Sequence, residues 1–391
     1  AVSASGYATC DKTDIVFPDD WTATTQQAKI QSSDIQADDQ FGYSVAIDGD
    51  TAVVAAYKED TGATNAGAAY VFIRSGTSWS QQAKIQASDA QSGDTFGTSI
   101  AISGDTVVVG ADGEDTGGTA AGAAYVFTRS GTSWSQQAKI QSSDIAAVDR
   151  FGWSAAIDGD TVVVGAYKKT SNAGAAYVFT RSGTSWSQQA KILSSDIQSS
   201  DYFGYRVGIS GDTVVVGAPN EDTGGSNAGA AYVFTRSGTS WSQQAKIQAS
   251  DKASPHVFGI SVAIDGDTMV AGAESEDTGG SNAGAAYVFT RSGTSWSQQA
   301  KIQTSDAQAD DRIGRSIAIS GDTVVVVAPK EDTGATDAGA AYIFTRSGTT
   351  WSQQEKIQAS DAQASDEFGT SVSISNNTVV VGTYKEDTGG D

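Results

Sequence analysis

The 391-residue sequence contains only one cysteine and one histidine. Cys10 has no second cysteine to pair with, so an internal disulfide framework is excluded. We expect Cys10 to be a free thiol, with a bridge to another chain as the alternative. The lone imidazole of His256 supplies neither a metal cluster nor a catalytic triad, because both need several groups together. We therefore interpret His256 as a substitution in a loop.

Long apolar runs and excess positive charge are also absent. No stretch approaches the roughly 18 apolar residues of a membrane span, and none resembles a cleavable signal peptide. Lys and Arg number 24 against 46 Asp and Glu, which gives a formal net charge of −22. Nucleic acids and anionic membrane surfaces repel such a charge, so we expect no nucleic acid partner and no membrane insertion.

Prolines are few, with four against 44 glycines. Together with abundant Ser, Thr, Val and Ala, this favours short strands and tight turns over helices. The strands belong to a repeat, because seven Phe-Gly or equivalent pairs recur every 55 residues, with one spacing of 52. A chain of this length would otherwise suggest two or three domains, but repeats that share one architecture indicate a single domain. The pairs begin at Phe41, Phe96, Phe151, Phe203, Phe258, Ile313 and Phe368.

Each unit contains four runs typical of strands, which is the signature of a propeller blade. In the first unit, residues 41–47 alternate small and larger side chains, as a crowded inner strand requires. Residues 51–56 are almost wholly apolar, as expected for a strand covered on both faces by neighbouring blades. Residues 68–74 and 79–86 complete the blade. Lys84 on the outer strand is predicted to be an edge charge that discourages aggregation.

The two ends of the chain predict how the ring closes. Residues 13–17 and 26–30 match the third and fourth strands of a unit, and the sequence stops where those strands would follow in the last unit. We therefore predict an all-β, seven-bladed propeller with four antiparallel strands per blade, closed by N-terminal strands that complete the last blade. The predicted boundaries are 1–391 for a single domain, 1–12 for an N-terminal extension, and 13–30 with 368–391 for the shared blade.

Three motifs in succession resemble a known repeat family. Phe-Gly is followed by Gly-Ala-Pro or a near variant, such as Gly217-Ala218-Pro219, and then by Ala-Tyr-Val-Phe. This pattern resembles the FG-GAP repeat family, whose best-known members are the integrin α-subunit propellers, and the resemblance covers residues 13–391. It implies a propeller fold and a secreted or cell-surface location. It does not fix the function, because family members include adhesion receptors, secreted proteins and parts of polysaccharide-active enzymes.

Many blades of that family carry a calcium loop of the form Asp-x-Asp-x-Asp-Gly between the first and second strands. Here the connection is only Asp-Gly-Asp or Ser-Gly-Asp, as at Asp48-Gly49-Asp50. This turn is too short to surround a cation with roughly six to eight oxygens. The family's calcium site is therefore not carried over, and Ca²⁺ is expected only if other loops supply the ligands.

Connections after the second and fourth strands of each unit are long and are expected on one face, the long-loop face, which holds most of the 46 acidic residues. Its loops repeat the pattern Asp-x4-Asp-x-Phe-Gly in six units, one of which has Ile-Gly in place of Phe-Gly. Such aspartates either hydrogen-bond the loop backbone as Asx turns, which we favour, or coordinate a cation together with a Glu-Asp-Thr-Gly loop. The candidate cation ligands are Asp34, Asp39, Asp89, Asp94, Asp196 and Asp201.

Residues beside the Phe-Gly pairs vary between otherwise similar units, as functional loops on a repeated scaffold do. The third unit is also three residues short, and two lysines replace its acidic loop. We predict an aromatic and basic notch there, suited to a sugar ring or a protein hot spot. Ordinary exposed residues on variable loops are the alternative. The predicted notch comprises Arg150, Trp153, Tyr167, Lys168, Lys169, Tyr202, Tyr205 and Arg206.

The repeated tryptophans, such as Trp79, Trp134 and Trp241, are assigned to packing because of their periodicity. The leading functional hypothesis is a non-catalytic extracellular or cell-surface binding or adhesion module that recognises a protein or glycan through its long-loop face. Alternatives are a carbohydrate-active enzyme and a structural matrix or coat protein. We expect no catalysis, because no acidic pair stands apart from the repeat to provide the two unlike carboxyl environments that glycoside hydrolysis needs.

Overall fold

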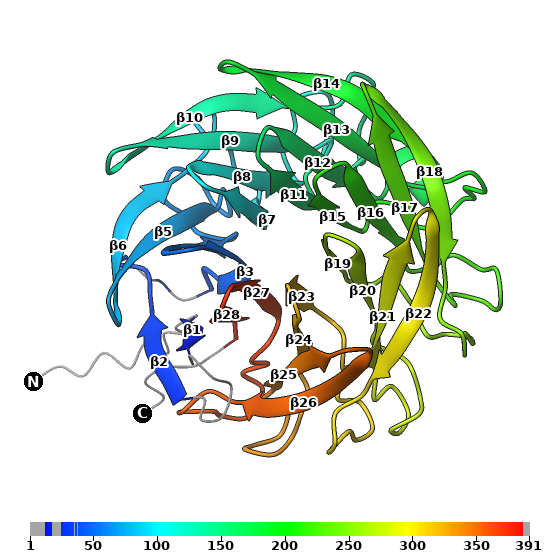
Figure 1. Ribbon diagram of the computed structural model, residues 1–391. Coiled ribbons are helices and arrows are strands. Elements are labelled where there is room, and N and C mark those ends of the chain that lie inside the picture. Colours follow the sequence, from blue (N-terminus) through cyan, green and yellow to red (C-terminus); the bar gives the residue numbers. More distant parts are fainter. Residues whose placement is uncertain (1–11, 18–24, 35, 37, 386–391) are drawn as a thin grey trace, which may run out of the picture.

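The computed structural model describes residues 12–17, 25–34, 36 and 38–385. These residues form an all-β propeller in which four-stranded antiparallel sheets surround a central axis (Figure 1). The predicted fold class is confirmed at this level. Cys10, most of the predicted N-terminal extension and the C-terminal segment 386–391 lie outside the described residues.

Six sheets are each formed by four consecutive strands. The first two contain β3 (Phe41–Asp48), β4 (Thr51–Ala56), β5 (Ala68–Ser75), β6 (Ser78–Ile85), and β7 (Phe96–Ser103), β8 (Thr106–Ala111), β9 (Ala123–Ser130), β10 (Ser133–Ile140). The next two contain β11 (Ser154–Asp158), β12 (Thr161–Ala166), β13 (Ala175–Ser182), β14 (Ser185–Ile192), and β15 (Arg206–Ser210), β16 (Thr213–Ala218), β17 (Ala230–Ser237), β18 (Ser240–Ile247). The fifth and sixth contain β19 (Val262–Asp265), β20 (Thr268–Ala273), β21 (Ala285–Ser292), β22 (Ser295–Ile302), and β23 (Ile317–Ser320), β24 (Thr323–Ala328), β25 (Ala340–Ser347), β26 (Thr350–Ile357). A four-residue helix, α1 (Lys169–Asn172), lies in the loop between β12 and β13.

A further four-stranded sheet joins the two ends of the described chain, in the order β2-β1-β28-β27. Its strands are β1 (Lys12–Phe17), β2 (Thr25–Ile30), β27 (Ser371–Ser375) and β28 (Thr378–Thr383). Strand β1 pairs antiparallel with β28, from Lys12 opposite Thr383 to Val16 opposite Val379. Lys12, which was assigned to the extension, therefore belongs to the sheet. We call this the closing sheet.

The closing sheet contacts the sheets on both of its sides. Ser371 Oγ donates to the carbonyl of Gly42 at 2.9 Å, and the amide of Ile47 donates to Ser373 Oγ at 3.2 Å. On the other side, Val379 shares an apolar cluster with Val325 of the sixth sheet. Figure 1 shows β3, β7, β11, β15, β19, β23 and β27 innermost, with β6 and the other fourth strands at the rim.

The core lies between adjacent sheets. Every residue of β4 is buried, as the apolar run predicted for a strand covered on both faces. Phe96 is fully buried in a cluster that joins Val53 of the first sheet to Val109 of the second. The glycine after each phenylalanine permits this close packing, because a Cβ at Gly152 would lie 2.2 Å from the carbonyl oxygen of Ala123.

Polar contacts connect neighbouring sheets near the rim. Trp134 Nε1 donates to Gln82 Oε1 of the preceding sheet at 2.9 Å, and Trp241 makes the same contact to Gln189 at 2.8 Å. The guanidinium of Arg129 lies over the Trp134 ring, 5.4 Å from its centroid. These contacts recur around the ring, which agrees with the prediction that the repeated tryptophans are packing residues.

Candidate functional site

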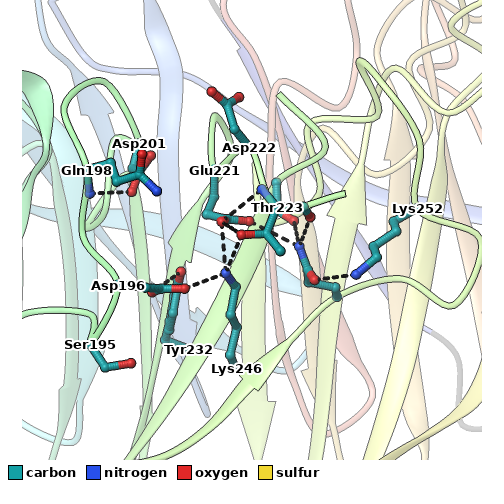
Figure 2. Close-up of polar contacts among 12 residues, drawn as sticks. Ser195, Asp196, Gln198, Asp201, Glu221, Asp222, Thr223, Tyr232, Lys246 and Lys252 are labelled. Atoms are coloured by element: carbon teal, nitrogen blue, oxygen red, sulfur yellow. Dashed lines mark hydrogen bonds and ion pairs between the residues drawn. The ribbon is translucent and has the colours of Figure 1, made fainter. Parts of the chain in front are cut away.

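The aspartates and glutamates of the long-loop face are arranged around lysines. Lys246 Nζ lies 2.6 Å from Asp196 Oδ2 and 2.8 Å from Glu221 Oε1, and Tyr232 also donates to Asp196 at 2.8 Å (Figure 2). Burial acts to raise the pKa of Asp196, but hydrogen bonds from Lys246 and Tyr232 outweigh it, so the pKa lies below its usual value. Lys84 and Lys139 occupy the same position in the first and second sheets.

This arrangement corrects two sequence-based predictions. Lys84 is not a free edge charge, because its ammonium is the counter-ion of Asp34 and of fully buried Glu59. The first aspartate of each candidate cation pair, at 34, 89 and 196, likewise holds a lysine rather than facing an open site. Within the described residues, no group of three or more His, Cys, Asp or Glu side chains is arranged to hold a metal ion.

The second aspartate of each pair stabilises the loop backbone, as favoured from the sequence. Asp39 Oδ2 accepts from the amide of Gln36 at 2.9 Å, and Asp94 and Asp201 accept from Gln91 and Gln198 at 2.7 and 2.8 Å. Burial raises the pKa of Asp39 to about 6 against the effect of that amide, and the negative charge of Glu59 adds to the rise. Hydrogen bonds within each loop, from backbone amides to the second aspartate, therefore hold these loops in shape.

The third sheet departs from this pattern. Lys169 occupies the position held by Glu59 in the first unit, and its side chain is buried rather than exposed in a notch. Its ammonium lies 2.7 Å from Asp149 Oδ2. Lys191 lies 2.7 Å from Asp144 Oδ2, which is its one carboxylate partner among the described residues. Lys169 is therefore a structural counter-ion, and its buried ammonium binds Asp149 rather than contributing a basic group to the predicted aromatic and basic notch. The sequence showed that lysine replaces the glutamate at this position, but it did not show that the carboxylate of Asp149 faces Lys169.

Shortening the third unit's loop also leaves a hollow beside α1. The hollow has a volume of about 380 Å³ and is lined by Thr170, Leu193 and Ile197. Leu193 replaces the glutamine that bonds the buried glutamate in other units, such as Gln248 with Glu221, and 43% of its surface is exposed. The aromatic residues of the predicted notch are not among the residues that line this hollow.

Most of the predicted notch residues do come together. The ring of Trp153 lies 4.8 Å from Tyr167 and 5.5 Å from Tyr205, measured between centroids, and Tyr167 lies 5.4 Å from Tyr202. The guanidinium of Arg206 lies 5.0 Å from the Tyr205 centroid and 5.8 Å from that of Trp153. Nearby, Lys168 lies over Tyr167 at 5.5 Å and Arg150 pairs with Asp112 at 3.0 Å.

Two of these residues, Trp153 and Arg206, reach a cavity of about 350 Å³ at the axis of the ring, which we call the axial cavity. It opens on the long-loop face, since its walls come from the starts of first strands and the ends of second strands. Below it, the inner strands form a second chamber of about 260 Å³ lined by isoleucines such as Ile102 and Ile264. The other large side chains of the axial cavity are Tyr43, Arg315, Glu367 and Tyr384.

Those four residues were not predicted as site residues. Tyr43 packs on Tyr57 at 4.1 Å and on Tyr384 at 5.8 Å, so a second aromatic group faces the cavity from the first and closing sheets. The available signal was their position: they lie next to a Phe-Gly pair or at the end of a second strand, where the units differ. The sequence marked these positions as variable, but only the closed ring places them beside Trp153.

Carboxylates near the axial cavity are paired with cations. Glu274 lies 3.0 Å from Arg315, and Glu367 lies 2.9 Å from Lys385. Arg206 is different, because across the described part of the chain it has no carboxylate within ion-pair distance and donates instead to the carbonyl of Tyr205 at 3.0 Å. Although the long-loop face is rich in acids, its axial centre therefore carries an unneutralised cation.

Comparison with known families agrees with this architecture. The FG-GAP repeat family matches residues 24–72, 79–127, 134–179, 186–234, 241–289, 296–344 and 351–391. The chain belongs to the FG-GAP repeat family. A comparison of this FG-GAP protein with curated proteins finds no significant match. In the described residues, its single short helix is neither long nor apolar enough to cross a membrane.

Proposed function

We propose that this FG-GAP protein is a closed seven-bladed propeller folded as a single domain. We further propose that it is secreted or located at the cell surface and acts as a non-catalytic binding module. Its ligand, a protein or a glycan, would bind the long-loop face at the axial cavity. The observation that carries this proposal is the concentration of non-repeated side chains around that cavity. The sheets that support it are nearly identical copies, so packing does not account for the differences.

The chemistry of the axial cavity supports recognition. Its volume of about 350 Å³ lies within the range of roughly 300 to 1,000 Å³ that is typical of ligand pockets. Trp153, Tyr43 and Tyr384 present aromatic surface beside charged groups, a combination common at binding hot spots. Such rigid side chains lose little conformational entropy when a ligand binds.

The pairing of the cavity's carboxylates favours binding over hydrolysis. Glycoside hydrolysis needs one carboxyl group that holds a proton and a second that is ionised. Glu367 is ion-paired with Lys385 and Glu274 with Arg315, so the two groups have similar cationic partners rather than the unlike environments that hydrolysis needs. A screen for degradation of polysaccharides by the purified protein tests the carbohydrate-active alternative, and turnover lost in a Glu367→Gln variant would establish it.

Replacing Trp153 and Tyr205 together with alanine should abolish ligand binding and leave the melting temperature within a few degrees of the wild type. Both rings are partly exposed at the mouth and are not part of the clusters between sheets. Binding is measured on arrays of glycans and of extracellular proteins, with melting temperature measured on the same samples.

The matched control is Val148→Ala with Leu193→Ala, which removes exposed apolar side chains from outer loops. This control should bind as the wild type does. Undiminished binding by the Trp153 and Tyr205 double variant to any ligand found on the arrays would place the site elsewhere.

A further inference from the structure

We propose that the axial cavity recognises an acidic sugar, and that Arg206 binds the carboxylate of that sugar. This inference rests on the proposed function and specifies its ligand. It starts from a single departure from the repeat. Six of the seven units carry serine at the second position after the Phe-Gly pair or its equivalent, and the fourth unit carries Arg206. The serines are Ser44, Ser99, Ser154, Ser261, Ser316 and Ser371.

The serine at this position has a structural task in several units. Ser99 Oγ donates to the carbonyl of Gly152 at 2.8 Å, and Ser154 Oγ donates to that of Gly204 at 3.0 Å. Each bond connects one sheet to the next. Arg206 replaces that small hydroxyl with a guanidinium that lines the axial cavity. The fourth unit therefore has a charged group at the proposed ligand site where other units have a repeated contact between sheets.

The Arg206 guanidinium is held in place without being neutralised. It lies over the rings of Tyr205 and Trp153, and one of its nitrogens donates to the Tyr205 carbonyl. Stacking orders the planar group and leaves further N–H donors for a carboxylate, which guanidinium binds in a two-pronged geometry. Arg315, on the same cavity, already has Glu274 as its partner. The free anion-binding capacity is therefore at Arg206.

The rest of the lining favours a sugar as the carrier of the carboxylate. Aromatic surface from Trp153, Tyr43 and Tyr384 lines the cavity together with serine hydroxyls such as those of Ser44 and Ser316. Aromatic rings contact the apolar faces of pyranoses, and hydroxyls pair with their polar edges. An extended peptide that binds by strand addition would instead need an accessible strand edge. The free edges of the first strands face the ring axis, and side chains of neighbouring sheets already bond amides there, as Ser373 Oγ accepts from Ile47 and Ser44 Oγ accepts from Ile100.

The overall charge limits the length of the acidic ligand. With a net charge of −22, the protein repels a long polyanion at distance, and the repulsion grows with every charge outside the cavity. A short oligomer with one uronate in the cavity avoids most of this cost. We therefore choose trimers of galacturonate and of mannuronate as probes, each compared with the neutral galactose or mannose trimer of the same linkage.

Isothermal titration calorimetry of the full chain tests the inference. At least one uronate trimer should bind at least tenfold more tightly than its neutral counterpart. Arg206→Ser should lose at least tenfold in affinity for it, and this variant should fold because serine occupies the position in the other units. The charge-matched control is Arg312→Gln, which removes an exposed arginine outside the cavity at a position where the first unit has Gln40. The control should change affinity by less than twofold.

The outcomes separate this inference from the proposed function. Equal binding of neutral and acidic trimers, or full uronate binding by Arg206→Ser, would show that the carboxylate is not recognised by Arg206. If neutral trimers bind and the Trp153 and Tyr205 double variant loses them, the inference fails while the proposed function stands. If no trimer binds, the acidic-sugar inference is wrong, and the array experiment alone then decides the proposed function.

Discussion

Lys139 and Lys191 occupy the same strand position in adjacent sheets but have different partners. Lys139 neutralises Glu114, whose side chain is 2% exposed, as well as Asp89. Lys191 pairs with Asp144 alone among the residues that the structure describes, and the Asp144 side chain is 43% exposed. A buried carboxylate that loses its counter-ion keeps its full desolvation cost, whereas an exposed one is resolvated by water. The contribution of each lysine is therefore set by the glutamate, which the third unit lacks.

Lys139→Met is expected to lower the free energy of unfolding by about 3 kcal/mol, because it leaves Glu114 buried without its cation. Lys191→Met, the matched control, should cost no more than about 1 kcal/mol, as is usual for exposed pairs. Chemical denaturation followed by tryptophan fluorescence measures both values. Equal losses in the two variants would show that the buried glutamate has no special dependence on its lysine.

At the scale of the strand, the sequence was sufficient to predict where most strands lie and which of them are buried. Residues 51–56 were predicted as a fully covered strand, and β4 spans Thr51–Ala56 with every residue buried. The prediction succeeded because alternation, turn residues and apolar runs are local features that repeat seven times. The partner of Lys84 could not be predicted in the same way, because Asp34 and Glu59 come from two different loops.

Strand β1, which pairs with β28 and so joins the two ends of the described chain, is expected to be essential for stability. Deleting residues 1–30 removes β1 and β2 and exposes the edge of β28, so we expect aggregation or a large fall in melting temperature. Deleting residues 1–11 alone is the control and should leave both properties unchanged, because β1 begins at Lys12. Size-exclusion chromatography and thermal unfolding report the result. A monomeric 1–30 deletion with an unchanged melting temperature would contradict closure by the N-terminal strands.

At the scale of the whole ring, the candidate site was only partly predictable. Trp153, Tyr167 and Tyr205 were expected to cluster because they come from neighbouring units. Tyr43 and Arg315 lie 272 residues apart in the sequence and line the same cavity, which follows only from closure of the ring. The acidic composition also gave no sign of the local charge, because the first aspartate of a loop, such as Asp196, is paired with a lysine, while Arg206 is not paired with a carboxylate in the described residues.

The central claim is that ligand binds at the axial cavity of the long-loop face. Its most direct test is a crystal structure of the full chain with the tightest-binding ligand from the glycan and protein arrays. The account predicts density for that ligand against Trp153 and Tyr43, with contact to the Arg206 guanidinium if the ligand carries a carboxylate. Density for the ligand on the short-turn face, or along the outer strands with the axial cavity free of ligand, would contradict the claim.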